Sequence, residues 1–427
     1  MRDTSFSICK ALAIICVVLS HAGGPSWLTS FVFQFHVPVF FICAGYFFKT
    51  KYADDEKTFI VRRIDSLYLP FLRWSIFFLL LHNLWFYTGV LNEQFGNAAG
   101  GVLHPYSWHD FSQRLWSIVF NMSGYDEFLC GAFWFFRALL LSSIGFLVGY
   151  KLSRRFIQHD DPKKIGWCIF FAAAFLSLWL ILGGLKVTGV AQGGYRELLG
   201  ITFMAIGFLY ARYKDVFSLN WQVGVGSFAI LVLLVLLCPS SMATRVNTSQ
   251  AFVLPIAGTA GFFMLLSLSR AIDKYTTVLK RVLVYIGDRT LYIFAFHLLA
   301  FKVISILKVY HYNLPWNKIG GHPVVTDNAQ TDMYFLLYLL AGIVLPLAWL
   351  AAYRYIMNRW GHGLGYARFL NIGWMTGAIR KLLSFSLFLL KSLVNGIIRT
   401  FQWVWQGIKS FFQGIKDVIS ASNPKDE

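Results

Sequence analysis

Charged side chains are scarce in this sequence of 427 residues, of which only 14% are Asp, Glu, Lys or Arg. Soluble globular domains carry about 25% charged residues, so the composition argues against a water-soluble enzyme. Acidic residues are especially few, with 20 Asp and Glu against 38 Lys and Arg. A net charge of +18 can indicate nucleic-acid binding, but here the basic residues stand in short breaks between apolar runs. We therefore expect no nucleic-acid partner.

Cysteine and metal-binding motifs are also sparse. The six cysteines fall mostly within apolar runs, where free thiols behave as small buried hydrophobes. Cys130 and Cys238 are the pair that could form a disulfide, because both lie near the outer ends of predicted membrane spans. The histidines within apolar runs show no ligand spacing such as His-Glu-x-x-His. We therefore expect no metal site.

Long apolar stretches are what the sequence has in abundance. The hydrophobic residues make up 57% of the chain and gather in runs near the length of a bilayer-spanning helix. Runs such as Ile76–Leu81 do not alternate as β-barrel strands do, and helices satisfy their own backbone amides in hydrocarbon. The sequence thus predicts an all-α polytopic membrane protein of about ten transmembrane helices. The predicted spans are 7–22, 29–48, 67–90, 131–150, 165–185, 195–211, 222–238, 251–270, 290–308 and 333–355.

The basic residues predict the orientation of these spans. If the N-terminus is cytoplasmic, most Lys and Arg side chains fall in inner loops or in the tail. An even number of spans then leaves both termini in the cytoplasm. The two longest outer segments, 91–130 and 309–332, are polar and rich in aromatic residues, which suits sugar contact or an interfacial aromatic belt.

A change in composition after residue 356 divides the chain into a membrane domain, 1–356, and a basic tail, 357–427. Within the tail, Gln406-Gly407-Ile408-Lys409 recurs seven residues later as Gln413-Gly414-Ile415-Lys416. Mixed basic and apolar positions of this kind predict amphipathic helices on the anionic inner leaflet. The alternative is an eleventh span through Ser384–Ile398.

Ionisable side chains inside apolar runs mark candidate functional residues, because charge at membrane depth is costly. Lys10 and His21 are eleven residues apart, which places both on one helix face, ~16 Å apart along the axis. A short hairpin brings His36 near His21. A histidine with a near-neutral pKa can accept and return a proton, as acyl transfer to a hydroxyl requires. We expect His82 and His297 to be packing residues.

Several motifs carry a family resemblance. Lys10 and His21 with their eleven-residue spacing, together with the following hairpin, resemble the opening of the membrane-bound acyltransferase-3 family, in particular its fucose 4-O-acetylase-like branch. The resemblance covers about residues 1–356, although Lys10 stands where the family commonly has Arg and Ala44 where it has a small polar residue. The supporting motifs are Phe35-His36-Val37-Pro38-Val39-Phe40-Phe41 with Gly45-Tyr46, Arg62-Arg63, Gly131-Ala132-Phe133-Trp134-Phe135, and Ile286-Gly287-Asp288-Arg289-Thr290-Leu291-Tyr292 followed by His297.

The resemblance implies an enzyme of the bacterial cytoplasmic (inner) membrane. It would move an acyl group, usually acetyl from cytoplasmic acetyl-CoA, to a hydroxyl of a cell-surface or lipid-linked carbohydrate. His21 would act as general base or carry the acyl group briefly, and His36 would position or relay. Lys10 would orient the thioester or stabilise charge on its oxygen.

The same resemblance points to residues that bind the donor. Arg62 and Arg63 would hold the phosphates of the donor, or would simply set membrane topology. Trp134 would stack on the donor or a sugar, or would be an ordinary interfacial tryptophan. Two other functions remain open from the sequence: a proton-coupled transporter of a small solute or sugar, and a non-catalytic scaffold that docks partners through its tail.

Overall fold

The structure is a computed structural model, and it contains helices and no β-strand within the residues that it describes. Besides three single positions in the tail, these residues are 3–95, 104–157, 160–217, 219–243, 246–326 and 333–360. The α-helices are α1 (Ser5–His21), α2 (Ser26–Phe33), α3 (Pro38–Tyr46), α4 (Glu56–Arg63), α5 (Leu69–Tyr87), α6 (Trp108–Asn121), α7 (Glu127–Cys130), α8 (Trp134–Phe156), α9 (Pro162–Leu182), α10 (Tyr195–Tyr213), α11 (Trp221–Leu237), α12 (Thr248–Asp273), α13 (Val278–Gly287), α14 (Thr290–His311) and α15 (Tyr334–Trp360).

The prediction of an all-α polytopic membrane protein is confirmed. In the described part of the chain, seven helical stretches are long and apolar enough to cross a membrane, and α1 and α11 are shorter apolar helices. The predicted span 195–211 is helix α10, which does not belong to either group. Because α10 packs among α3, α8 and α9, it needs less apolar surface than a lipid-facing helix. The seven stretches are Ser26–Tyr46, Glu56–Tyr87, Phe128–Phe156, Pro162–Leu182, Thr248–Asp273, Thr290–His311 and Tyr334–Asn358.

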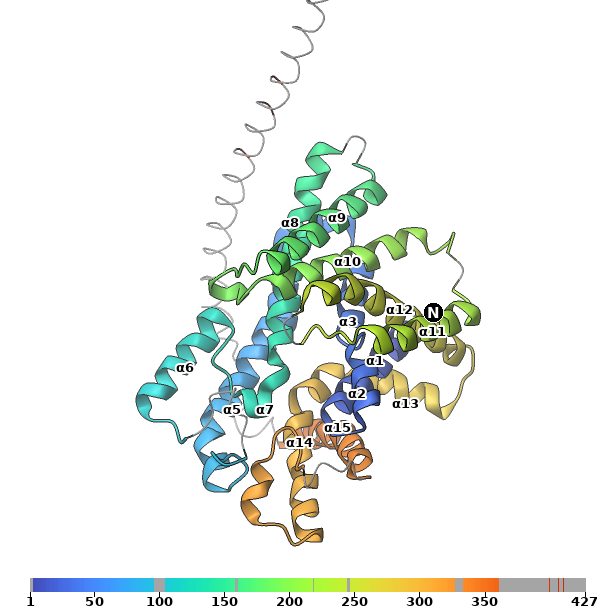
Figure 1. The fold of residues 1–427 in the computed structure, drawn as a ribbon. Helices are drawn as coiled ribbons and strands as arrows, with labels where there is room; N and C mark the ends of the chain where they lie inside the picture. Colours follow the sequence, from blue (N-terminus) through green and yellow to red (C-terminus); the bar gives the residue numbers. More distant parts are fainter. Residues whose placement is uncertain are drawn as a thin grey trace, which may run out of the picture. The chain divides into compact units, whose positions relative to one another are not determined.

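Helix α1 lies against helices from the other end of the domain. It packs on α12, α13 and α14, so the first segment of the chain is enclosed by late ones (Figure 1). Gly287 makes this approach possible, because a Cβ at that position would lie 1.8 Å from the backbone oxygen of Ser7. Because α14 begins three residues after Gly287, the contact also holds the start of α14 near α1.

The predicted span 29–48 is not one continuous helix. It divides into α2 and α3, with a turn at residues 34–37 that contains His36. Pro38 is the first residue of α3 and has no amide hydrogen to continue the ladder of the preceding helix. The break therefore places His36 at a helix junction rather than in the middle of a helix.

Helices α3 and α10 lie in backbone contact (Figure 1). A Cβ at Gly45 would lie 1.9 Å from the backbone oxygen of Met204, and one at Gly207 would lie 1.9 Å from that of Ile42. Only glycine permits this spacing. Helix α10 therefore fixes the position of α3.

The helix that carries Arg62 and Arg63 begins earlier than the predicted third span, which started at residue 67. Helices α4 and α5 are joined by a π-helical segment, Ile64–Tyr68, immediately before Pro70. The wider turn accommodates a proline that cannot donate its own backbone hydrogen bond. Both arginines consequently stand on a helix continuous with a membrane span.

Two long segments predicted to be outer contain ordered structure in their described parts. Residues 104–130 include α6 and α7, and residues 312–326 are held to α14 by two buried lysines. Lys302 Nζ donates to the carbonyl oxygens of Ile319 (3.0 Å) and Gly321 (2.6 Å), and Lys308 Nζ donates to that of Val325 (2.9 Å). These bonds hold residues 319–325 against the C-terminal half of α14.

Contacts within the chain divide it into two units, residues 1–350 and residues 351–427. Of the second unit the structure describes the end of α15 and three single positions. The tail helices predicted for 357–427 and the alternative span Ser384–Ile398 lie outside the described residues. The boundary at residue 356 stays a prediction.

Candidate active site

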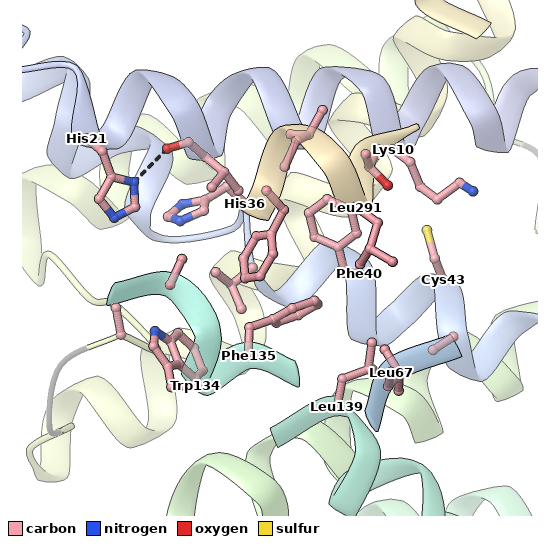
Figure 2. A pocket seen from close by; sticks show the side chains of 18 of the residues that line it. Lys10, His21, His36, Phe40, Cys43, Leu67, Trp134, Phe135, Leu139 and Leu291 are labelled. Atoms are coloured by element: carbon pink, nitrogen blue, oxygen red, sulfur yellow. Dashed lines mark hydrogen bonds between the residues drawn. The ribbon is translucent and has the colours of Figure 1, made fainter. Parts of the chain in front are cut away.

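A cavity of about 260 Å³ lies between α1, the α2–α3 junction, α4, α8 and α14. Five of the six residues singled out from the sequence line it (Figure 2). They are Lys10, His21, His36, Arg63 and Trp134.

The two ends of this cavity differ in chemistry. Figure 2 shows His21, His36 and Trp134 at one end, and Lys10 with Cys43 at the other. Aromatic and aliphatic side chains, including Phe40, Phe135, Leu139 and Leu291, line the space between. The site is thus a cavity with an imidazole end and an ammonium end, and helix α1 contributes a residue to each end.

His21 is held in one tautomer by the backbone of its own helix. Its Nδ1 lies 2.9 Å from the carbonyl oxygen of Val17, which can only accept a hydrogen bond. Nδ1 therefore carries the proton in the neutral ring, and Nε2 is left with a free lone pair. His36 repeats the arrangement, with its Nδ1 2.7 Å from the carbonyl oxygen of Val32. Each ring can accept a proton at Nε2.

His297 lies beside His21, with the ring centroids 5.3 Å apart. It is fully buried, and its Nδ1 donates to the carbonyl oxygen of Phe294 (2.9 Å). Its Nε2 has no hydrogen-bond partner among the described residues. The sequence predicts a packing role for His297, although this residue also ends the family motif that begins at Ile286. The helix contact that brings it to His21 has no signal in the sequence.

Trp134 stands away from the cationic end of the cavity. The guanidinium of Arg196 lies over its ring at 4.5 Å and covers one face. Arg196 also donates to the backbone oxygen of Ala243, another residue of the cavity lining. The uncovered face and the position near His21 favour contact at the imidazole end. The role of Trp134 in donor binding stays a prediction.

Arg62 does not line the cavity. Its side chain is exposed and donates to the hydroxyl of Tyr52 at 3.3 Å, whereas Arg63 on the same helix lines the cavity. The structure therefore separates the two neighbouring arginines, and a part for Arg62 in donor binding stays a prediction.

Comparison with protein families shows to which family the chain belongs. A family model described as an acyltransferase domain, that of the acyltransferase-3 family, matches residues 3–326, a range that includes every residue of the cavity lining. The chain belongs to the acyltransferase-3 family. No curated protein and no solved structure matches it. The expected resemblance is confirmed, and this acyltransferase-3 protein is a membrane acyltransferase.

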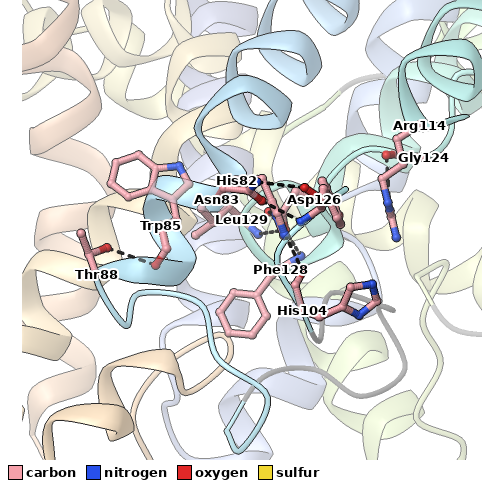
Figure 3. Close-up of polar contacts among 11 residues, drawn as sticks. His82, Asn83, Trp85, Thr88, His104, Arg114, Gly124, Asp126, Phe128 and Leu129 are labelled. Carbon is pink, nitrogen blue, oxygen red and sulfur yellow. Dashed lines mark hydrogen bonds and ion pairs between the residues drawn. The ribbon is translucent and has the colours of Figure 1, made fainter. Parts of the chain in front are cut away.

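A second buried polar cluster in this acyltransferase-3 protein is structural. His82 Nδ1 lies 3.2 Å from Asp126 Oδ2, and His82 Nε2 lies 3.1 Å from the carbonyl oxygen of His104 (Figure 3). Both ring nitrogens thus face acceptor atoms of the protein, and the His82 and Asp126 side chains are both buried. Tyr106 stacks on the imidazole at 3.4 Å. The cluster ties segment 104–126 to α5, so His82 belongs to the packing of the domain, as predicted.

The remaining polar side chains add no ligand set. Among the residues that the structure describes, no three His, Cys, Asp or Glu side chains are arranged to hold a metal ion. All six cysteines are free, so the suggested disulfide between Cys130 and Cys238 is absent.

Proposed function

We propose that this acyltransferase-3 protein transfers an acetyl group from cytoplasmic acetyl-CoA to a hydroxyl of a cell-surface or lipid-linked carbohydrate. The observation that supports this most directly is the cavity with cations at one end and imidazoles at the other. An acyl-CoA donor is anionic at its phosphates and reactive at its distant thioester. A carbohydrate hydroxyl needs a base to take its proton as its oxygen attacks the thioester. The two ends of the cavity meet these two needs.

The cationic end suits the donor. Lys10 stands at this end and Arg63 also lines the cavity, and guanidinium and ammonium groups bind phosphate by charge-assisted hydrogen bonds. On the predicted topology this end faces the cytoplasm, where acetyl-CoA is made. We place the protein in the inner membrane with both termini inside. Lys10 and His21 are ~16 Å apart along α1, so Lys10 is better placed to hold the donor than to stabilise charge on an oxygen beside His21.

The imidazole end suits the transfer step. The unprotonated Nε2 of His21 takes the proton of the acceptor hydroxyl, while the hydroxyl oxygen attacks the thioester carbonyl carbon. The carbon–sulfur bond then breaks, and the CoA thiolate recovers the proton from the His21 imidazolium. In the covalent variant of the mechanism, Nε2 attacks the thioester carbonyl carbon and CoA leaves as the thiolate. The acceptor hydroxyl then attacks the acetyl carbon, the bond to Nε2 breaks, and the hydroxyl proton passes to the thiolate. His36 and His297 position the ring or relay the proton.

A two-part experiment tests the proposal. Purified protein in nanodiscs should release CoA thiol from acetyl-CoA only when an acceptor glycan is present. Mass spectrometry of surface glycans from cells with and without the gene should reveal an acetyl difference that names the acceptor. A protein that carries solute in proteoliposomes without thiol release would instead be the proton-coupled transporter. Family membership favours acyl transfer between these two.

A further inference from the structure

A second hollow in the domain is an open groove of about 600 Å³ bordered by α9, α10, α11 and α12. Its lining is almost entirely aliphatic and aromatic. Leu209 and Ala260 of its lining are buried, whereas Trp167 and Ile230 are each 43% exposed. The groove shares no lining residue with the catalytic cavity. It is a separate site on the surface of membrane-spanning helices.

Two cations stand at one end of this groove, and each contacts a residue of the lining. Lys163 Nζ lies 4.8 Å from the centre of the Tyr213 ring, and Arg270 donates to the hydroxyl of Tyr210 at 3.1 Å. Lys163 is in the first turn of α9, and Arg270 is in the last turn of α12. Helix ends of this kind lie at the membrane surface, where lipid phosphates are found.

The same end of the groove is closed by aromatic rings. Phe217 and Phe263 have centroids 5.1 Å apart, and the Tyr210 ring lies 5.4 Å from that of Phe263. The apolar groove thus begins beneath a cationic, aromatic rim. A ligand that fits has one anionic end and a long apolar body.

We propose that this groove binds an anionic phospholipid. Its acyl chain occupies the space between α9 and α11, and its phosphate lies against Lys163 and Arg270. The apolar walls fit any lipid chain, but the two cations favour an anionic headgroup over a zwitterionic one. On the predicted topology the rim faces the inner leaflet, which carries the anionic lipids.

Photo-crosslinking tests the proposal with the full-length protein in nanodiscs. The probes are phosphatidylglycerol and phosphatidylcholine with the same diazirine-bearing acyl chain, at equal mole fraction. Phosphatidylglycerol should label peptides of α9–α12 more strongly than phosphatidylcholine. Lys163→Gln and Arg270→Gln should each lower that labelling about fivefold and leave labelling by phosphatidylcholine unchanged. Ile230→Trp, which narrows the groove, should lower labelling by both lipids.

Lys57→Gln is the matched control, since it removes an exposed lysine of α4 that does not border the groove. Its labelling should equal that of the wild type, and thermal melting in detergent shows that each variant is folded. Equal labelling by both lipids in the wild type would overturn the proposal, as would phosphatidylglycerol labelling that is unchanged in the Lys163→Gln and Arg270→Gln variants. Neither result depends on acyltransferase activity, so the proposal stands or falls independently of the proposed function.

Discussion

The imidazole rings of His21 and His297 meet at the imidazole end of the cavity, with their centroids 5.3 Å apart, although they belong to α1 and α14. His297 Nε2 is buried without a hydrogen-bond partner among the described residues. A buried acceptor left without a donor costs about 1–3 kcal/mol. His297 itself is fully buried and does not line the cavity, so within the site it faces the His21 ring rather than a reactant.

Replacement of His21 tests the transfer step. We expect His21→Ala to lower the rate of acetyl transfer by about 10²–10⁴-fold, the range for loss of general acid–base catalysis. Membrane insertion should be unchanged, because alanine is tolerated at the end of an apolar helix. The measurement is acceptor-dependent thiol release. His109→Ala, which alters an exposed histidine of α6, is the control and should retain activity. Near-normal transfer by the His21→Ala variant would refute the assignment.

Replacement of His297 separates positioning from packing. His297→Leu keeps the volume but removes Nε2, so we expect kcat to fall while the melting temperature stays close to that of the wild type. His297→Gln places an amide near the position of Nε2 and should recover part of kcat. If the leucine and glutamine variants have equal kcat, the Nε2 atom has no part in the reaction.

Cys43 provides a probe of donor binding. This thiol is 4% exposed and lines the cavity near Lys10. Acetyl-CoA bound at the cationic end should slow alkylation of Cys43 by a maleimide, measured by peptide mass spectrometry. Cys168→Ser removes the exposed thiol that would otherwise consume reagent. Lys10→Gln should weaken the protection. Protection that requires neither acetyl-CoA nor Lys10 would place the donor elsewhere.

His322 makes the outer segment sensitive to pH. Burial first, and then the charge of Lys302, lowers the pKa of His322 from 6.5 to about 4, against a smaller opposing effect of Asp126. The folded segment thus holds His322 neutral, and it loses stability as the pH falls from 6.5 towards 4, where the unfolded segment binds the proton more tightly. Hydrogen-exchange protection factors of residues 312–326 should be lower at pH 5 than at pH 7. His322→Phe should abolish the difference, and a wild-type segment with equal protection at both values would contradict the prediction.

The buried His82–Asp126 pair of Figure 3 should contribute more to stability than a half-exposed ion pair does. Asp126→Ala leaves the His82 ring without its acid and removes two backbone contacts at the start of α7, to Phe128 and Leu129. We expect a loss of about 3–5 kcal/mol, as for other buried pairs that lose one partner. Glu56→Gln breaks a half-exposed pair with Lys151 and should cost at most about 1 kcal/mol. Similar melting temperatures for the two variants would show that the buried pair contributes little.

Much of this architecture could be predicted from the sequence, because membrane spans are set by local apolar length. The helical period alone placed Lys10 and His21 on one face of α1, and the structure has both in one cavity lining. The turn at His36 was harder, since apolar residues continue on both sides of Pro38 and hide the break. Helix α10 was predicted from its apolarity, but its burial among other helices was not.

The part of the site that the sequence did not reveal depends on tertiary contacts. His297 and His21 come together only because α1 packs beside α14. Arg62 and Arg63 are neighbours in the chain, yet the helical rotation between them leaves only Arg63 in the cavity lining. Periodicity within one helix cannot show which face meets a helix from a remote segment.

The backbone contact between α3 and α10 has a consequence for how variants of this enzyme should be interpreted. Phe40, Cys43 and Ala44 of α3 form a wall of the cavity, and Gly45 and Gly207 set the distance of that wall from α10. Any side chain at either glycine forces the wall inward or the two helices apart. A saturation screen scored by activity would thus rank these two glycines with His21, although neither meets a reactant. Such false positives are recognised by a loss of thermal stability that accompanies the loss of activity, because the added side chain clashes with backbone atoms of the opposing helix.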